Sequence, residues 1–193
     1  MGTALEMVDE DGAEALTLRS LATRLRSSTA TLYRHFSGRA ELTRAVVDAL
    51  FAEVDLDEDV LAHATWDAAL RHIAEAMFKV LEGHRNVSPL LLSELPTGPH
   101  ALRLRERSLA VLTANGFDPV DAVRTYATLA RYVLGFGVQV PGEDAAGARP
   151  EGERSRQAGL VGSVDLGEEF RYGLDLMLDG LRGRRRASPD AGR

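Results

Sequence analysis

The chain has 193 residues, a formal net charge of −6 and no cysteine. The lack of cysteine excludes disulfide bonds and thiolate metal sites, and no apolar run approaches the roughly 20 residues that span a bilayer. Because the sequence also shows no signal-peptide pattern at its start, it favours a cytoplasmic protein. The 3.6-residue spacing of its apolar side chains predicts an all-α chain with a small N-terminal and a larger C-terminal domain.

The first predicted helix is short and ends at a glycine. Leu5 and Val8 supply its apolar face, and Asp11-Gly12 offers a glycine C-cap. In the second predicted helix, Thr17 can cap the first turn. The apolar face of this second helix repeats at i, i+3, i+4 and i+7, through Leu18, Leu21, Ala22 and Leu25.

A third helix is predicted from about Thr29, and either Ser27 or Ser28 can cap it. Leu32 and Phe36 point inward from this segment, which leaves an outer face of hydroxyl, aromatic and arginine side chains, namely Thr29, Thr31, Tyr33 and Arg34. A fourth helix from about Arg39 carries its apolar side chains on one side, at Leu42, Ala45, Val46, Ala49 and Leu50. Two short helices joined by a tight turn form a helix-turn-helix, whose second helix enters the major groove of DNA.

The charge of the chain is unevenly distributed. Residues 17–44 contain six arginines against one acid, Glu41, whereas residues 1–16 contain five acids and no base. A basic segment in an otherwise acidic protein is expected when one face contacts phosphates and the rest does not. Alternatively, these arginines are only water-exposed side chains on the helix surfaces and contact no phosphate.

Residues 4–50 resemble the DNA-binding domain of the TetR family of bacterial transcriptional regulators. The matching motifs are Leu16-Thr17-x-Arg19-x-Leu21-Ala22 and Thr31-Leu32-Tyr33-Arg34-His35-Phe36, followed by Glu41-Leu42. The resemblance implies a three-helix, homeodomain-like helix-turn-helix domain. It continues near the C-terminus, where Phe170-x-x-Gly173-Leu174-Asp175-Leu176 is similar to the tetracycline-repressor-like C-terminal domain.

The resemblance also implies which side chains contact DNA. It places Thr17 and Arg19 at the edge of the groove, and four residues of the recognition helix opposite the bases, namely Ser28, Thr29, Thr31 and Arg34. It places Tyr33, His35 and Arg39 near phosphates. Arg34 can donate two hydrogen bonds to guanine or can bind phosphate alone, and His35 can instead pack inside the domain.

Two features depart from the family pattern. The first helix starts almost at Met1, whereas family members usually carry ten or more residues before it, so residues missing before Met1 are one explanation. Arg26 occupies the turn position where glycine is common. A left-handed conformation costs a non-glycine residue about 1 kcal/mol, so we expect the turn to be slightly reshaped.

The C-terminal part is predicted to be helical throughout, after an acidic link at residues 55–59. The expected helices cover Trp66–Gly83, 89–94, 100–115, 119–140 and 166–182. The composition of residues 139–167 predicts a loop with a helical turn near 156–161. This loop is either a solvated linker or a segment that becomes ordered around a ligand. The predicted domains are therefore 1–50 and 51–185, followed by a disordered basic tail at 186–193.

The resemblance implies a dimer and a ligand cavity in this C-terminal domain. The helix at 119–140 is apolar on two sides, so it must be covered twice. In the family this helix and the last one form a four-helix dimer interface, although both can also be core helices of a monomer. Candidate cavity residues are Ile73, Met77, Leu91, Leu112, Tyr126 and Arg131, where Arg131 is either a polar anchor or part of a surface salt bridge.

No catalytic, cofactor or metal-ligand constellation is evident in the sequence. The family resemblance implies a homodimeric, ligand-responsive regulator that binds an inverted repeat in double-stranded DNA. We expect it to be a repressor that a small apolar molecule other than tetracycline releases from its operator. The alternatives are a helical ligand-binding dimer that has lost DNA binding and, more remotely, an enzyme.

Overall fold

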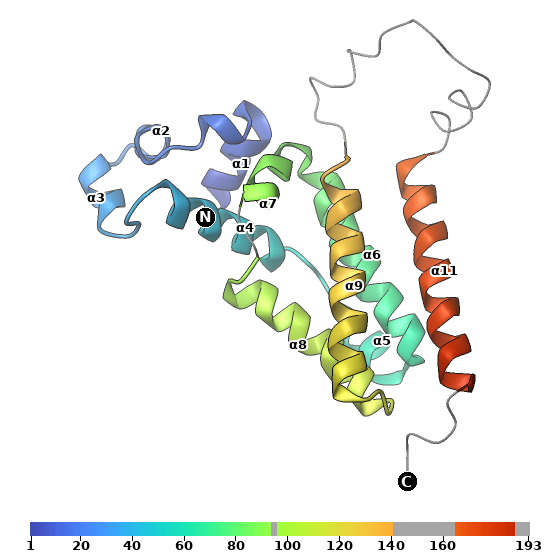
Figure 1. Cartoon of the computed structure of the whole chain (residues 1–193). Coiled ribbons are helices and arrows are strands. Elements are labelled where there is room, and N and C mark those ends of the chain that lie inside the picture. The colour runs from blue at the N-terminus through green and yellow to red at the C-terminus, as the bar shows by residue number, and fades with distance from the viewer. Residues whose placement is uncertain (94–95, 141–164, 188–193) are drawn as a thin grey trace, which may run out of the picture.

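The computed structural model describes residues 1–93, 96–140 and 165–187, and within these ranges every regular element is a helix (Figure 1). This confirms the all-α prediction. The α-helices are α1 (Gly2–Asp11), α2 (Leu18–Arg24), α3 (Thr29–Tyr33), α4 (Arg39–Ala52), α5 (Glu58–His63), α6 (Trp66–Gly83), α7 (Ser88–Ser93), α8 (Pro99–Ala114), α9 (Pro119–Gly137) and α11 (Leu166–Ala187). The helical turn expected near 156–161 and most of the expected tail lie outside the described residues.

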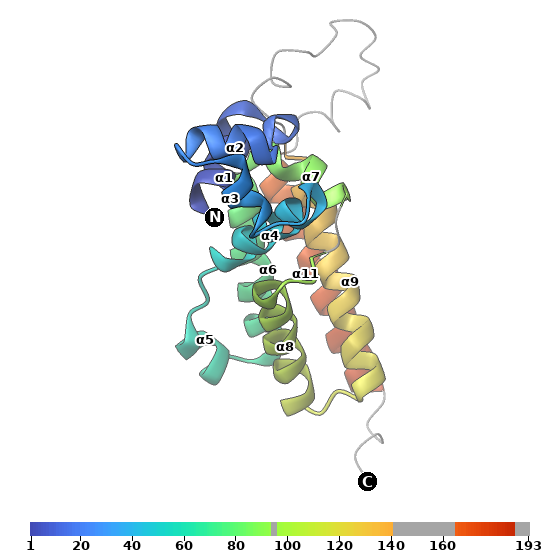
Figure 2. The same cartoon turned by 90° about the vertical axis from the view of Figure 1, so that its left-hand side faces the viewer.

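Helices α1 to α3 gather at one end of the molecule, beside the start of α4 (Figures 1 and 2). Their shared core is formed by side chains with no exposed surface, Val8 of α1, Leu16 before α2 and Leu42 of α4. As predicted, α1 ends at Gly12, whose φ of 83° is a conformation that glycine adopts easily.

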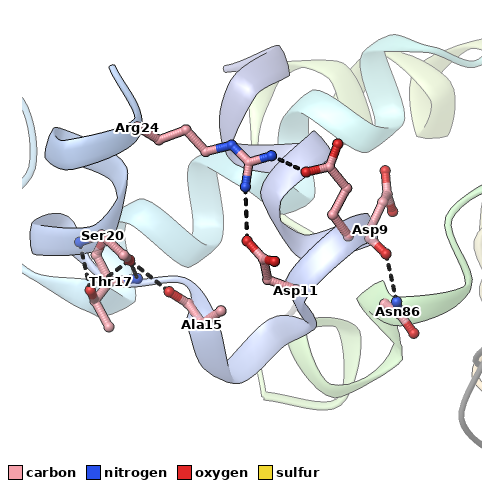
Figure 3. Close-up of polar contacts among 8 residues, drawn as sticks. Asp9, Asp11, Ala15, Thr17, Ser20, Arg24 and Asn86 are labelled. Atoms are coloured by element: carbon pink, nitrogen blue, oxygen red, sulfur yellow. Dashed lines mark hydrogen bonds and ion pairs between the residues drawn. The ribbon is translucent and has the colours of Figure 1, made fainter. Parts of the chain in front are cut away.

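Side-chain caps fix where α2 and α3 begin. The Thr17 hydroxyl accepts a hydrogen bond from the Ser20 amide at 3.0 Å, and the Ser20 hydroxyl accepts one from the Thr17 amide at 3.0 Å (Figure 3). This capping box confirms Thr17 as the N-cap of α2. Of the two serines considered for α3, Ser28 is the cap, since its hydroxyl accepts from the Thr31 amide at 3.1 Å.

The turn between α2 and α3 differs in one respect from the sequence prediction. Leu25 was expected on the buried face of α2, but it is 45% exposed because α2 ends at Arg24 and the chain turns away there. The next residue, Arg26, has a φ of 51°, which is the left-handed conformation expected from its place in the turn. The turn therefore holds a non-glycine residue in a conformation that costs about 1 kcal/mol.

We expect the substitution Arg26→Gly to stabilise the protein by up to about 1 kcal/mol, because glycine adopts a positive φ without this cost. Arg26→Ala is the control, since it removes the same side chain but keeps the unfavourable conformation. Urea unfolding of the two variants isolates the backbone effect. If the glycine variant is no more stable than the alanine variant, the turn is not strained at this position.

The C-terminal domain is built from longer helices, and α6, α9 and α11 lie lengthwise in it (Figure 1). Helix α6 has the predicted bounds, because one face repeats apolar residues throughout its length, and Leu70, Met77 and Leu81 are buried there. The predicted acidic link instead leads into α5. This helix was not expected, and its N-cap is Asp57, whose Oδ1 accepts from the Asp59 amide at 2.9 Å.

Helix α11 packs on α6 and α9 through aromatic side chains. The Phe170 ring of α11 stacks on Phe78 of α6 at 4.1 Å between centroids, and the Tyr132 hydroxyl of α9 donates to the Phe170 carbonyl at 2.8 Å. The helices approach closely at two glycines, because a side chain at Gly173 would overlap Tyr132 and one at Gly137 would overlap Leu81.

The last turns of α11 are held against the start of α6. Arg182 forms an ion pair with the largely buried Asp67, and the Arg185 guanidinium lies 5.7 Å from the Trp66 ring and 4.8 Å from the Phe117 ring. These contacts explain why α11 continues to Ala187, five residues beyond its predicted end. None of the described helices is long and apolar enough to cross a membrane.

Candidate DNA-binding surface and effector cavity

Helix α3 presents a polar face to solvent above one buried anchor. Leu32 is 6% exposed and fixes the helix to the core, whereas Tyr33 is 59% exposed. Arg34 and His35 follow directly and are also exposed, so the structure does not support the alternative in which His35 packs inside the domain. The remaining hydroxyl residues predicted to face DNA are exposed or half-buried on the same segment, namely Ser28, Thr29 and Thr31.

A carboxylate braces the turn that leads from this segment into α4. The Glu41 carboxylate accepts from the Ser37 amide and from the Ser37 hydroxyl, each at 2.7 Å. These two hydrogen bonds, with a smaller contribution from the charge of Arg44, lower the pKa of Glu41 below its ordinary value. The ionised carboxylate thus braces the turn at which α4 begins.

Acidic residues near the N-terminus form ion pairs with two of the six arginines of residues 17–44. Arg24 forms ion pairs with Glu10 and, at 2.8 Å, with Asp11, and so joins α2 to the end of α1 (Figure 3). Arg39 lies 3.3 Å from the exposed Glu14 carboxylate and donates to the Ala13 carbonyl at 3.4 Å. A phosphate at Arg39 would therefore compete with Glu14.

The other four arginines of this region, Arg19, Arg26, Arg34 and Arg44, are exposed and form no ion pair within the described ranges. Arg19 and Thr17 line one shallow hollow beside α2. Since two of six arginines bind acids of the same chain, the cationic surface is formed chiefly by these four side chains.

The His84 side chain joins the C-terminal domain to α1 and to the end of α4. It caps the C-terminus of α6, and its Nδ1 lies 2.8 Å from Asp9 of α1 while its Nε2 lies 2.8 Å from Glu53 at the end of α4. Asn86 adds a hydrogen bond to the Asp9 carbonyl at 2.7 Å (Figure 3). The other carboxylate oxygen of Asp9 is buried without a hydrogen-bond partner among the described residues.

Two carboxylates around one imidazole favour its protonated form. Partial burial by itself lowers the pKa of His84, but the hydrogen bonds to Glu53 and Asp9 and the charges of both carboxylates outweigh burial and raise the pKa above its ordinary value of 6.5. A protonated His84 donates a hydrogen bond to each of the two carboxylates, Asp9 and Glu53, at the same time.

We therefore expect His84 to make stability depend on pH. Its contribution is fully present below pH 6.5, the value for the unfolded chain, and is lost as pH rises through the raised folded-state pKa. Urea unfolding of the wild type and of His84→Gln as a function of pH should show a difference of up to about 1 kcal/mol that disappears at high pH. Parallel curves would mean that the pKa of His84 is the same in the folded and the unfolded protein.

A cavity lies in the C-terminal domain, between α4, α6, α8 and α9. It contains about 640 Å³ of space that no atom fills, part of it at an open mouth. Twelve of its fourteen lining residues are apolar and none is charged; the lining is formed by Phe51, Leu70, Ile73, Ala74, Met77, Pro96, Ala101, Leu104, Ser108, Tyr126, Leu129, Ala130, Val133 and Leu134. A predominantly apolar lining of this kind is typical of small-molecule sites.

Among these fourteen lining residues, only Ser108 and Tyr126 have polar side chains. The Ser108 hydroxyl already donates to the Leu104 carbonyl at 2.9 Å. Burial raises the pKa of the Tyr126 phenol, more than the charge of Arg105 lowers it. The phenol therefore stays neutral and can donate a hydrogen bond.

The structure brings together three of the six predicted cavity residues, Ile73, Met77 and Tyr126. The other three do not line it: Leu91 of α7 is half-buried, and Leu112 of α8 is fully buried in the hydrophobic core. Arg131 lies exposed on α9, where it donates to the Ala127 carbonyl of its own helix at 3.2 Å. It points to solvent because the neighbouring Ala130 takes the position on the cavity side.

Sequence reasoning missed Phe51, which reaches the cavity from α4 and is 8% exposed. The predicted domain boundary at residue 50 divided α4, which runs on to Ala52 and contacts both domains. The signal was present, because the apolar periodicity of α4 continues past Leu50 to Phe51.

Exposed apolar side chains also occur on the outside of the C-terminal domain. Among the described residues of that domain, the large hydrophobic side chains that are exposed lie on α9 and α11, apart from Leu92 of α7. They are Val120 and Val123 of α9 and Tyr172 and Leu176 of α11, each more than half exposed.

Comparison with known proteins identifies both domains. The family described as bacterial regulatory proteins of the tetR family matches residues 1–46, and the tetracyclin repressor-like C-terminal domain matches residues 61–185. The chain belongs to the tetR family of bacterial regulatory proteins. This assignment covers the helix-turn-helix and the helical domain that surrounds the cavity.

Relatives of this TetR family protein align over most of its length. It is 29% identical over 195 residues to the class A tetracycline repressor protein from transposon 1721 of Escherichia coli, a match that covers 94% of this chain and 88% of the relative. It is 33% identical over 136 residues to an HTH-type transcriptional regulator of Saccharopolyspora erythraea, where the match covers 70% of this chain but only 56% of the relative.

A solved structure shares the whole architecture. A variant of TetR from Acinetobacter baumannii AYE, crystallised in complex with minocycline, is 28% identical and superposes with a TM-score of 0.77. The superposition covers 97% of this TetR family chain and 92% of that chain.

Proposed function

We propose that this TetR family protein is a transcriptional repressor that binds an inverted repeat in double-stranded DNA as a homodimer. A small apolar molecule in the cavity would release it. One observation carries this proposal: a polar recognition helix, fixed on a buried anchor, stands in the same chain as an apolar cavity, and the next helix in the chain, α4, lines that cavity through Phe51.

The proposed DNA contacts divide by role. Arg34 and the hydroxyl residues Ser28, Thr29 and Thr31 would face base edges, and Thr17 and Arg19 the edge of the groove. Tyr33, His35 and Arg39 would contact phosphates. All of these side chains are exposed or half-buried within residues 17–39, which supports this division.

The proposed dimer would pair α9 and α11 with the same helices of a second copy. Water-exposed Val123, Tyr172 and Leu176 would then be buried, as the exposed apolar surface of the C-terminal domain suggests. A two-fold dimer would place two recognition helices in successive major grooves, about 34–36 Å apart or at a wider spacing.

The proposed effector is uncharged and largely apolar, because a charged group in this cavity would lose its hydration with no counter-charge among the lining residues. Tyr126 would donate a hydrogen bond to one acceptor on the molecule. The minocycline in the related structure is bound by a protein of the same fold, but Ile73 and Met77 give this chain an apolar wall. The proposal places the protein in the cytoplasm, where it has access to DNA.

Selection from a library of random duplexes tests the proposal. The full chain is incubated with the library, and bound duplexes are amplified and sequenced over several rounds. We expect enrichment of an inverted repeat whose half-sites are one or more helical turns apart. Failure to enrich any sequence would overturn DNA recognition and favour a helical ligand-binding dimer.

A further inference from the structure

Helix α4 belongs to the DNA-binding domain where it begins and to the cavity wall where it ends. Its first residue, Arg39, follows the recognition helix after a turn braced by Glu41, and Phe51 in its last turn lines the cavity. A shift at either end of this 14-residue helix therefore reaches the other end.

Asp48 lies one turn before Phe51 and binds the start of α8. Its Oδ1 accepts hydrogen bonds from the amides of His100 at 2.9 Å and Ala101 at 3.3 Å. The first amides of a helix need acceptors, which a residue of the same segment usually supplies. Here the local N-cap position is Gly98, which has no side chain, and the carboxylate comes from the other domain.

The helix that Asp48 caps is a wall of the cavity. Ala101, Leu104 and Ser108 of α8 line it at helical spacing, and Pro96 lines it just before α8 begins. Helix α4 thus contacts the cavity twice, directly through Phe51 and indirectly through the capped end of α8. A molecule that displaces α8 also pulls on the carboxylate that α4 carries.

We propose that Asp48 is the positioning residue that makes α4, and with it the recognition helix, follow movements of α8. This inference rests on the proposed function, since it explains how an occupied cavity changes DNA binding. Coupling between two sites is reciprocal, so DNA bound at α3 must also change the stability of α8. That reverse effect is measurable without knowing the effector.

Hydrogen–deuterium exchange of the full chain, with and without the selected duplex, measures this reverse effect. In the wild type we expect the duplex to slow exchange in residues 101–112 of α8 by about fivefold or more, although α8 lies in the other domain. In Asp48→Ala we expect the duplex to protect α3 as before, but to change exchange in α8 by less than about twofold.

Asp57→Ala is the matched control. Asp57 also caps a helix through its Oδ1, which accepts from the Asp59 and Val60 amides, but this cap lies within its own segment at α5. The variant loses one aspartate N-cap and one negative charge, as Asp48→Ala does. We expect it to keep the duplex-dependent protection of α8.

Gly98→Ala breaks the same contact without removing the carboxylate. Gly98 has an ordinary backbone conformation, with φ −72° and ψ 169°, so alanine is acceptable there except that its Cβ would overlap the Asp48 side chain. We expect this variant to lose remote protection of α8 as Asp48→Ala does. It keeps the test decisive if Asp48→Ala does not fold.

Two results would overturn the inference. One is a wild type whose α8 is unaffected by the duplex. The other is that Asp48→Ala speeds exchange of α8 equally with and without DNA, as a purely structural cap would. Either result, obtained with a duplex that still protects α3, leaves the proposed function intact, whereas failure to select any duplex contradicts the proposed function itself.

Discussion

We expect the substitution Leu176→Glu to hold the protein as a monomer and to lower its affinity for the selected duplex at least about a hundredfold. Leu176 is 57% exposed on α11, within the surface proposed to pair with a second copy. A two-fold interface would bury the new charge twice, and an unpaired buried charge costs about 3–5 kcal/mol. Sedimentation equilibrium measures the first effect and fluorescence anisotropy of a labelled duplex the second.

Leu92→Glu is the matched control, because Leu92 is 74% exposed but lies on α7, outside the proposed interface. The same substitution there should leave both the oligomeric state and the duplex affinity unchanged. A Leu176→Glu protein that still forms a dimer at micromolar concentration would show that α11 does not lie in the interface.

The second large effect concerns base recognition. We expect Arg34→Ala to weaken binding to the selected duplex by about 10- to 100-fold, as for the loss of a bidentate contact to guanine, while binding to a random duplex changes much less. Arg34 directly follows α3, is exposed, and has no ion pair within the described residues. Its removal therefore should not disturb the fold.

Arg39→Ala provides the comparison. Arg39 is proposed to contact phosphate, so its loss should weaken binding to both duplexes by the same factor. The factor should be small, because Arg39 is already paired with Glu14 in the free protein. If Arg39→Ala selectively weakens the specific complex and Arg34→Ala weakens both alike, the two roles are reversed.

Local signals made the helices and their caps predictable from the sequence. Thr17 and Gly12 act within one or two turns of their own position, so their chemistry fixed the ends of α2 and α1. Periodicity fixed α6 from its first to its last residue, because one face is buried along its whole length. The family motifs of the N-terminal segment similarly depend on residue types close together in the chain.

Contacts between distant segments could not be predicted in this way. The end of α11 depends on Arg182 and Arg185 meeting residues of α6 and of the loop before α9, more than 60 residues away. The position of Arg131 outside the cavity lining has the same origin, since the rotation of α9 decides whether Ala130 or Arg131 faces inward. Such rotations follow from packing against helices that sequence spacing alone does not place.

Trp66 is the one tryptophan in the sequence, and it lies where the final helix docks. Its indole meets the Phe117 ring edge-on at 5.1 Å between centroids and lies beneath the Arg185 guanidinium. Because indole emission responds to nearby cations and to water, the tryptophan fluorescence of the protein reports on the surroundings of Trp66, which include this contact. The fold thus contains its own optical reporter of whether α11 is docked, and no label is needed to follow it.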